Sequence, residues 1–276
     1  MRTRLLTWRY PSPGEGPTRP PREALFSLGL QRWVVAFVRV LAFGDVHAPD
    51  YLPLLSRSLR SQELRGVELV LVAGDVVAKG GWRACEGVAG LLEQLLPGVP
   101  VVAVFGNEDY AEVRGRMREV CGAFTWLDDE AVRLELPSGR VVVVGTTGAL
   151  DRPTRWQERH VLGVRELYRA RLERVGQLLR EHAGKGLTIL LTHYPPRCRT
   201  LEGEREEFWP EMSSTGLRRL VEQYQPDAVV HGHLHLSRVH RDFIGSTPVY
   251  NVSLPAVGGA TLLELQRRGL LGFLQP

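Results

Sequence analysis

The stretch Leu41-Ala42-Phe43-Gly44-Asp45-Val46-His47 decides the fold of this chain. It closes an apolar run, residues 34–43, with a glycine, after which a carboxylate and an imidazole follow with one residue between them. Such a run predicts a buried strand that leads into a loop at its carboxyl end. In open α/β sheets, ligands bind outside the carboxyl ends of the strands, so we expect a functional site at this loop.

The same arrangement recurs along the chain. Further apolar runs cover residues 67–73, 101–105, 187–192 and 227–230. The residues that follow them and are able to bind a metal are Asp75; Asn107, Glu108 and Asp109; His193; and His233 and His235. A hydrophobic core does not require that pattern, and we therefore interpret the five strand ends as one site. His231, which precedes the last pair, is expected to pack or to support a ligand.

The candidate metal ligands combine three oxygen donors with four imidazoles. They are Asp45, His47, Asp75, Asn107, His193, His233 and His235. Two ions roughly 3.5–4 Å apart would use such a set if one carboxylate bridges them, and Asp75 is the predicted bridge. Mixed carboxylate and imidazole ligation favours Mn²⁺, with Fe or Zn²⁺ also suitable, over Ca²⁺ or a soft copper site.

The spacing of these residues suits the proposed site. In an extended segment, residues i and i+2 point the same way, so Asp45 with His47, and His233 with His235, can face the same ions. The glycines at positions 44, 74, 106 and 232 are expected to let the backbone turn tightly and approach the ions. A metal pair lowers the pKa of a bound water, neutralises phosphoryl charge and orients an in-line attack. The predicted reaction is hydrolysis of a phosphomonoester or phosphodiester by in-line attack of a metal-bridging hydroxide.

The ordered motifs resemble the five sequence blocks of the calcineurin-like metallophosphoesterase family over roughly residues 34–255. The blocks are Gly44-Asp45-x-His47, Gly74-Asp75, Gly106-Asn107-x-Asp109, Thr192-His193 and Gly232-His233-x-His235. The resemblance implies an α/β fold, a four-layer αββα sandwich of two mixed β-sheets flanked by helices, with the site between the loops of the two sheets. It also implies that Asp45, His47, Asp75 and His235 hold one metal, while Asp75, Asn107, His193 and His233 hold the other.

One position departs from the family pattern. Many members carry a histidine after the asparagine, where it contacts the phosphate, and this chain has Glu108. An ionised carboxylate there repels a phosphate dianion, and it donates a proton only if its pKa is raised. We therefore take Asp75, Asn107, Glu108 and Asp109 as the candidate catalytic residues, with Asp109 expected to support Asn107. The proton donor stays open, with His160 or His240 as less favoured candidates.

Composition fits a single globular domain over residues 32–276. The chain has 276 residues, 43% of them hydrophobic, and a formal net charge of +4. Residues 1–31 are rich in proline, glycine and arginine, which predicts a poorly ordered arm or, less favoured, a basic tail for an anionic partner. Three scattered cysteines without CxxC spacing, Cys85, Cys121 and Cys198, favour reduced thiols and a cytoplasmic location over a disulfide frame. No segment is suited to a membrane, because the apolar run at 34–43 is too short and contains Arg39.

Hydrophobic periodicity predicts the remaining elements. Helices are expected over residues 51–59, 82–95 and 164–182, and over 215–224 with Thr215 as the cap. A hairpin is expected over 133–144, and late strands at 238–244, 248–252, 260–266 and 270–274 suggest a second, mixed sheet. Residues 145–160 have no clear period and either lie over the site or form an ordinary surface loop.

Several functions remain open at this stage. The substrate is expected to be a phosphorylated small molecule, a nucleotide or a phosphoprotein. A nuclease with a groove built from Arg152, Arg155, Arg159, Arg197 and Arg199 ranks lower, because no nucleic-acid module is recognisable. A non-catalytic scaffold ranks last, because all seven candidate ligands are present. Trp156, Trp209 and Tyr194 either stack on a base or sugar or simply pack, and the sequence leaves the oligomeric state unknown.

Overall fold

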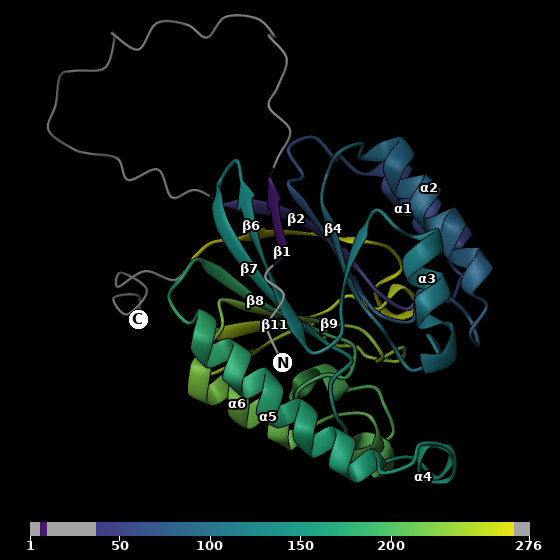
Figure 1. Cartoon of the computed structure of the whole chain (residues 1–276), viewed down its shortest axis with the longest axis vertical. Coiled ribbons are helices and arrows are strands. Elements are labelled where there is room, and N and C mark those ends of the chain that lie inside the picture. Colours follow the sequence, from purple (N-terminus) through teal and green to yellow (C-terminus); the bar gives the residue numbers. More distant parts are fainter. Residues whose placement is uncertain (1–5, 10–36, 268–276) are drawn as a thin grey trace, which may run out of the picture.

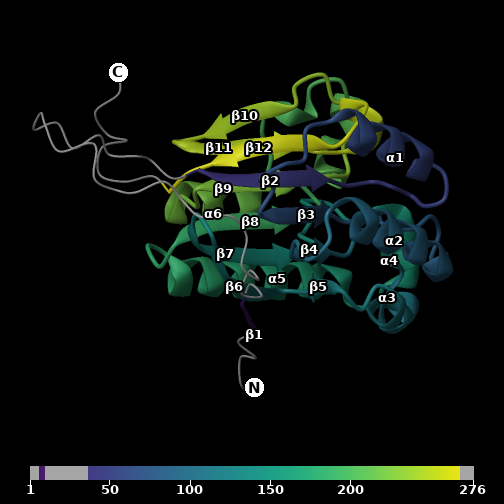
Figure 2. The ribbon, with the colours of Figure 1, turned by 90° about the horizontal axis from the view of Figure 1, so that it is seen from above.

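Two β-sheets pack face to face, and helices cover the outer face of each (Figures 1 and 2). This computed structural model describes residues 37–267, and the backbone alone of residues 6–9. The predicted four-layer αββα sandwich is therefore confirmed. Within the described ranges, no helix is both long enough and apolar enough to cross a bilayer.

The first sheet has five strands in the order β12-β2-β3-β4-β5. Its strands are β2 (Val38–Phe43), β3 (Leu69–Ala73), β4 (Val101–Val104), β5 (Phe124–Leu127) and β12 (Thr261–Leu265). Strands β2 to β5 run parallel, and β12 pairs antiparallel with β2. The parallel strands are near-continuous apolar runs because both of their faces are covered.

The second sheet has seven strands in the order β1-β6-β7-β8-β9-β11-β10. Its strands are β1 (Leu6–Arg9), β6 (Glu130–Leu136), β7 (Gly139–Thr146), β8 (Leu187–Thr192), β9 (Ala228–His231), β10 (Arg241–Ile244) and β11 (Thr247–Asn251). Strands β7, β8, β9 and β11 run parallel to one another, whereas β6 and β7 form the predicted antiparallel hairpin. Fully buried aliphatic side chains such as Leu71, Val143 and Leu191 fill the space between the two sheets.

Helices form the two outer layers. The five-stranded sheet is covered by α1 (Leu52–Ser61), α2 (Cys85–Leu95) and α3 (Arg114–Val120), and the seven-stranded sheet by α5 (Val164–His182) and α6 (Thr215–Tyr224). Short elements complete the fold: α4 (Arg155–His160), α7 (Leu254–Val257), η1 (Trp82–Ala84), η2 (Ala111–Val113), η3 (Arg199–Leu201) and η4 (Glu206–Glu211). Helices α1, α2, α5 and α6 each place one apolar stripe on their sheet, which is why the 3.6-residue period identifies these four from sequence; the short helix α3 was not predicted.

The structure corrects two details of the predicted elements. Helix α6 is capped by Ser214, whose hydroxyl accepts from the Leu217 amide, and not by Thr215. The late strands do not form one sheet, because β10 and β11 join the seven-stranded sheet while β12 extends the other. The predicted strand at 270–274 lies outside the described residues. The predicted arm, residues 1–31, also lies outside the described residues, except for β1, which pairs with β6.

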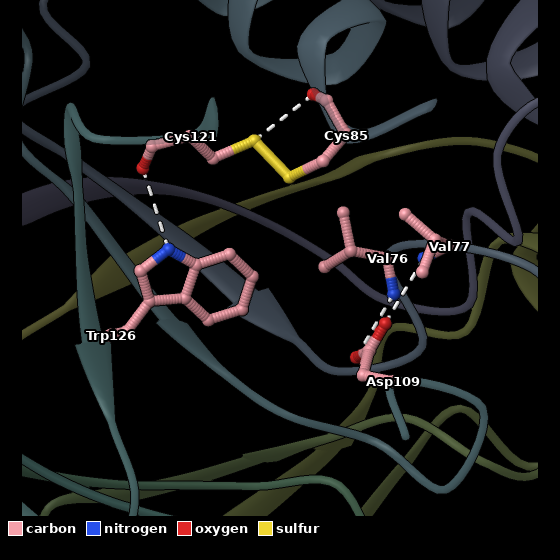
Figure 3. Close-up of a disulfide and its surroundings, with 6 residues drawn as sticks. All are labelled: Val76, Val77, Cys85, Asp109, Cys121 and Trp126. Atoms are coloured by element: carbon pink, nitrogen blue, oxygen red, sulfur yellow. Dashed lines mark hydrogen bonds between the residues drawn. A yellow bond between two sulfur atoms is a disulfide. The ribbon is translucent and has the colours of Figure 1, made fainter. Parts of the chain in front are cut away.

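The expectation of three reduced cysteines is wrong, because Cys85 and Cys121 form a disulfide (Figure 3). Cys85 begins α2 and Cys121 directly follows α3, and the packing of both helices on one sheet brings together residues separated by 36 positions. Sequence spacing does not reveal that proximity. Cys198 is buried and forms no disulfide. The cysteine pattern therefore gives no support to a reducing compartment.

Candidate metal centre

The candidate ligands gather where the carboxyl ends of the parallel strands of both sheets meet. Asp45 and His47 follow β2, Asp75 follows β3, and Asn107 follows β4 in the five-stranded sheet. His193 follows β8, and His233 and His235 follow β9 in the seven-stranded sheet. Neighbouring parallel strands end at the same edge, so the chain order of the motifs becomes one spatial cluster.

Asp45, His47 and His235 form one group that could hold a metal. The Nε2 atom of His235 lies 3.2 Å from Oδ1 of Asp45, and the Nε2 atom of His47 lies 3.9 Å from the same oxygen. The two Nε2 atoms are 3.5 Å apart. Ligand atoms that each sit about 2.1 Å from one ion are separated by roughly 3 to 4 Å, so this spacing fits a shared cation.

Asp45, Asp75 and His193 form a second group. Oδ2 of Asp75 lies 3.5 Å from Nε2 of His193 and 3.8 Å from Nε2 of His47. Asp75 therefore contacts the histidines of both groups, as a bridging ligand must. The Asn107 side-chain oxygen faces His193 Nε2 at 3.0 Å, which places the predicted asparagine ligand at the same group.

The electrostatics of the cluster call for a cation. Burial, together with the neighbouring carboxylates of Asp109 and Asp45, raises the pKa of Asp75 well above its usual value. Burial also opposes ionisation of Asp45, but the imidazoles of His235, His193 and His47 hold its pKa below the usual range. Several acids buried together at one point repel one another unless a positive charge lies between them.

Two further observations test whether a metal fits these residues. Oδ1 of Asp45 is buried and accepts no hydrogen bond, which leaves a lone pair unused. Burial lowers the pKa of His193 to about 4, so its ring is neutral near pH 7. The Nδ1 atom of that ring lies 2.9 Å from the Ala73 carbonyl and carries the proton, so Nε2 presents its lone pair to Asp75 and Asn107. Oxygen and nitrogen lone pairs that converge in this way suit a divalent ion.

The backbone at the ligands departs from the predicted extended geometry. Asp45, His47, Asp75 and His233 all have positive φ, at 57°, 38°, 47° and 73°. Loop geometry, and not the alternation of a strand, therefore brings Asp45 and His47 to the same point. Left-handed backbone at non-glycine residues costs roughly 1–3 kcal/mol each and is concentrated at functional sites.

His233, and His231 just before the last motif, differ in their placement. The backbone amide of His233 donates to Oδ2 of Asp45, and its ring lies 4.9 Å from that of His193. His233 is adjacent to the second group, although its ring nitrogens belong to neither of the two groups above. His231 packs as expected, buried with Nε2 3.1 Å from the Thr200 hydroxyl.

Comparison with known proteins now decides the family. The family model for calcineurin-like phosphoesterases matches residues 38–237, most of the chain. This chain belongs to the calcineurin-like phosphoesterase family. It is accordingly a metallophosphoesterase, a hydrolase of phosphate esters, and the resemblance seen in the five motifs is confirmed. A search of curated proteins returned no match.

Solved structures support the fold of this phosphoesterase. The phosphopantetheinyl hydrolase of Mycobacterium tuberculosis is 17% identical with a TM-score of 0.58, covering 80% of this chain and 90% of its own. The TT1561 protein of Thermus thermophilus is 15% identical with a TM-score of 0.54, covering 83% of this chain and 99% of its own. At these identities the likeness concerns the fold.

Glu108 has a placement that the sequence did not suggest. Its Oε2 lies 3.2 Å from Nδ1 of His47 and also accepts from the Lys79 amide. A carboxylate on Nδ1 orients the imidazole and directs Nε2 toward a metal. In this phosphoesterase Glu108 is thus placed to position His47, and the distance between Glu108 and the histidine ring is the signal that sequence alone lacks.

Asp109 is a positioning residue. Its buried carboxylate accepts hydrogen bonds from the amides of Val76, Val77 and Gly106 at 3.2, 3.1 and 2.8 Å. Figure 3 shows it beneath Val76 and Val77. It therefore joins the loop after Asp75 to the loop that carries Asn107. Through the Gly106 amide it is placed to support Asn107, as expected from the sequence.

Two glycines allow the close approach that the predicted site requires. A Cβ atom at Gly106 would lie 2.1 Å from Oδ1 of Asp75. Gly74 has a φ of 84°, and a Cβ atom there would lie 2.7 Å from Nδ1 of His193. Any side chain at either position would displace a proposed ligand.

The remaining candidates separate into those near the centre and those elsewhere. Trp156 and Tyr194 line a cavity beside Asn107 and His233, whereas Trp209 packs and donates its indole hydrogen bond to the Glu204 carbonyl. Three arginines of the suggested nucleic-acid groove form ion pairs with acidic residues: Arg152 with Glu211, Arg197 with Asp151 and Arg199 with Glu202. His240 lies 3.1 Å from the Ser237 carbonyl, and His160 is exposed with Nδ1 2.8 Å from the Trp156 carbonyl.

Proposed function

We propose that this phosphoesterase hydrolyses phosphate esters with two divalent ions, most favourably Mn²⁺, held around Asp75. The observation that carries the proposal is the position of Asp75, whose Oδ2 lies within 4 Å of the Nε2 atoms of both His47 and His193. These histidines come from different sheets, and nothing in the packing of the cores requires them to meet.

The ligand assignment is the one that the five family motifs imply, and it adds Asn107 and His233 to the two groups described above, with Asp75 as the shared residue. Asp45, His47, Asp75 and His235 would hold one ion, and Asp75, Asn107, His193 and His233 the other. Bound divalent ions would neutralise charge on the phosphoryl oxygens and lower the pKa of a water molecule that attacks phosphorus in line with the leaving group. The Glu108 carboxylate holds His47 in orientation, and the Asp109 carboxylate joins the loop after Asp75 to the loop that carries Asn107.

A metal titration with a matched pair of variants tests the proposal. The full chain, stripped with a chelator, is assayed on an aryl phosphomonoester and an aryl phosphodiester while Mn²⁺, Fe²⁺ or Zn²⁺ is added. We expect hydrolysis to appear with Mn²⁺ and to collapse in Asp75→Asn, which removes the shared charge. Asp50→Asn is the control, because Asp50 is exposed and lies only three residues after His47.

The outcomes separate the alternatives. Equal rates in Asp75→Asn and in the unaltered chain would refute the bridging role. A chain that binds no divalent ion by elemental analysis would instead support the scaffold interpretation. The nuclease alternative predicts cleavage of a DNA or RNA oligonucleotide with binding that weakens steeply as salt rises.

A further inference from the structure

A cavity of about 300 Å³ adjoins the proposed metal centre. It is lined by the proposed ligands Asn107 and His233 and by the aromatic side chains of Tyr110, Trp156 and Tyr194. That volume lies at the small end of the range for sites that bind small molecules. A phosphate at the metal centre would therefore place its ester group beside these rings.

Trp156 is the unusual member of this lining, because it is 54% exposed although it is large and apolar. Its ring lies 4.7 Å from the ring of His160, at 21° between planes, and 6.3 Å from that of Tyr110, at 22°. The Trp156 ring thus lies roughly parallel to each of its two neighbours. Its exposed part offers an aromatic surface on which a further aromatic ring can lie.

Helix α4 holds this surface in a fixed place. A capping box starts the helix, in which the Thr154 hydroxyl accepts from the Gln157 amide and the Gln157 side chain accepts from the Thr154 amide. Gln157 is buried, and its side-chain nitrogen donates to the Tyr194 hydroxyl at 2.9 Å. Tyr194 directly follows His193 and its ring packs edge-on against His233 at 4.8 Å. The hydrogen bond from Gln157 to Tyr194 and the contact of Tyr194 with His233 therefore connect helix α4 to the proposed ligands.

The charges of the cavity restrict what enters it. Its charged lining residues are Glu108 and Glu211, of which Glu211 is paired with Arg152, and no lysine or arginine is among the described residues that line it. Carboxylates accept hydrogen bonds from N–H groups and repel further anionic groups. The cavity thus disfavours polyphosphates and nucleic-acid strands, and it favours a leaving group that is planar, uncharged and rich in N–H donors.

We propose that the leaving group of the substrate is a nucleoside, and that Trp156 and Tyr110 stack on its base while the single phosphate lies at the metal centre. This inference rests on the proposed function for its phosphate half. A second cavity of about 510 Å³ also includes Tyr110 and Trp156 but adds Val164 and Leu167. A lipid-like alkyl leaving group would use that apolar lining, and it is the competing outcome.

The experiment compares the Mn²⁺-loaded full chain and its variants on three monoesters: adenosine 5′-monophosphate, glycerol 3-phosphate and dodecyl phosphate. Base stacking on an aromatic side chain is expected to give Trp156→Ala about a 5-fold to 100-fold loss in kcat/KM for the nucleotide. That loss should fall mainly on KM. Trp156→Phe keeps a ring and should recover most of it, and glycerol 3-phosphate should be little affected. Phe243→Ala is the control, because Phe243 is another half-exposed aromatic residue and lines neither cavity.

A binding measurement separates this inference from the proposed function. Adenosine, which carries no phosphate, is titrated into the chain without added metal, and binding is followed by isothermal titration calorimetry, which does not depend on the replaced tryptophan. Saturable binding that Trp156→Phe largely keeps and Trp156→Ala abolishes supports the stacking surface, even if no ester is hydrolysed. Unchanged adenosine affinity in Trp156→Ala overturns it. A nucleotide kcat/KM that responds equally to Trp156→Ala and Phe243→Ala also overturns it. So does a preference for dodecyl phosphate over the nucleotide, even while hydrolysis itself succeeds.

Discussion

Removing the carboxylate of Asp109 should lower the free energy of unfolding, because this side chain holds together two loops of the proposed metal centre. The carboxylate accepts three backbone hydrogen bonds, from Val76, Val77 and Gly106, and all four residues are buried. A hydrogen bond to a charged group contributes about 1.5–3 kcal/mol, so three of them are worth about 5 kcal/mol or more. Asp109→Ala would also leave three buried N–H groups without partners.

Burial raises the pKa of Asp109, while the same three amides lower it and partly offset that rise. Asp109→Asn keeps one oxygen acceptor but turns an amide group toward donors, so we expect it to lose about half as much stability, roughly 2–3 kcal/mol. Because whole domains are stable by only about 5–15 kcal/mol, the alanine variant should be close to unfolding.

Urea denaturation in the presence of a chelator measures these losses without a contribution from bound metal. Asp50→Asn, the exposed control, should shift the free energy of unfolding by less than about 0.5 kcal/mol. An Asp109→Ala chain that keeps its stability within about 1 kcal/mol but loses hydrolysis would refute the positioning role. Asp109 would then be a residue that touches the reacting groups.

Two further changes test other parts of the structure. Gly106→Ala should lower kcat/KM by about 100-fold or more in steady-state kinetics, because the new Cβ would lie 2.1 Å from Asp75 Oδ1 and displace the carboxylate. Gly90→Ala in α2 is the control, because nothing lies within 4 Å of the added carbon. Replacing Cys85 and Cys121 together by serine should lower the free energy of unfolding by up to about 4 kcal/mol, the chain-entropy value for the 36-residue separation. An oxidised chain whose urea midpoint does not move on adding reductant, despite verified loss of the bond, would contradict that figure.

The sequence predicts most of the architecture because the period of its apolar residues is strong. The amphipathic stripe over residues 164–182 matches α5 in both bounds, and the apolar runs that end in Asp45, Asp75 and His193 are strands β2, β3 and β8. Parallel strands that end at one edge bring their following residues together whatever the details of the loops. That is why the cluster around Asp75 could be predicted without any spatial information.

What the sequence could not provide depends on contacts between distant segments. The partner of β12 is β2, more than 200 residues earlier, and no local pattern identifies it. The position of Glu108 on His47, and the bond between Cys85 and Cys121, are likewise set by how loops and helices pack. The region over residues 145–160 lacked a period because only six residues of it form a helix, α4, and Gln157 fixes that helix by a single buried contact.

The division of the proposed ligands between two sheets has a consequence for how the whole chain holds together. Asp45, His47, Asp75 and Asn107 belong to one half of the sandwich, and His193, His233 and His235 to the other. An ion coordinated by both halves would hold them together. At a free concentration about 100 times its dissociation constant, it would raise the free energy of unfolding by about 2.7 kcal/mol. A cell starved of the proposed metal would then lose both the activity and the stability of the chain, so that resistance to proteolysis would report the metal supply.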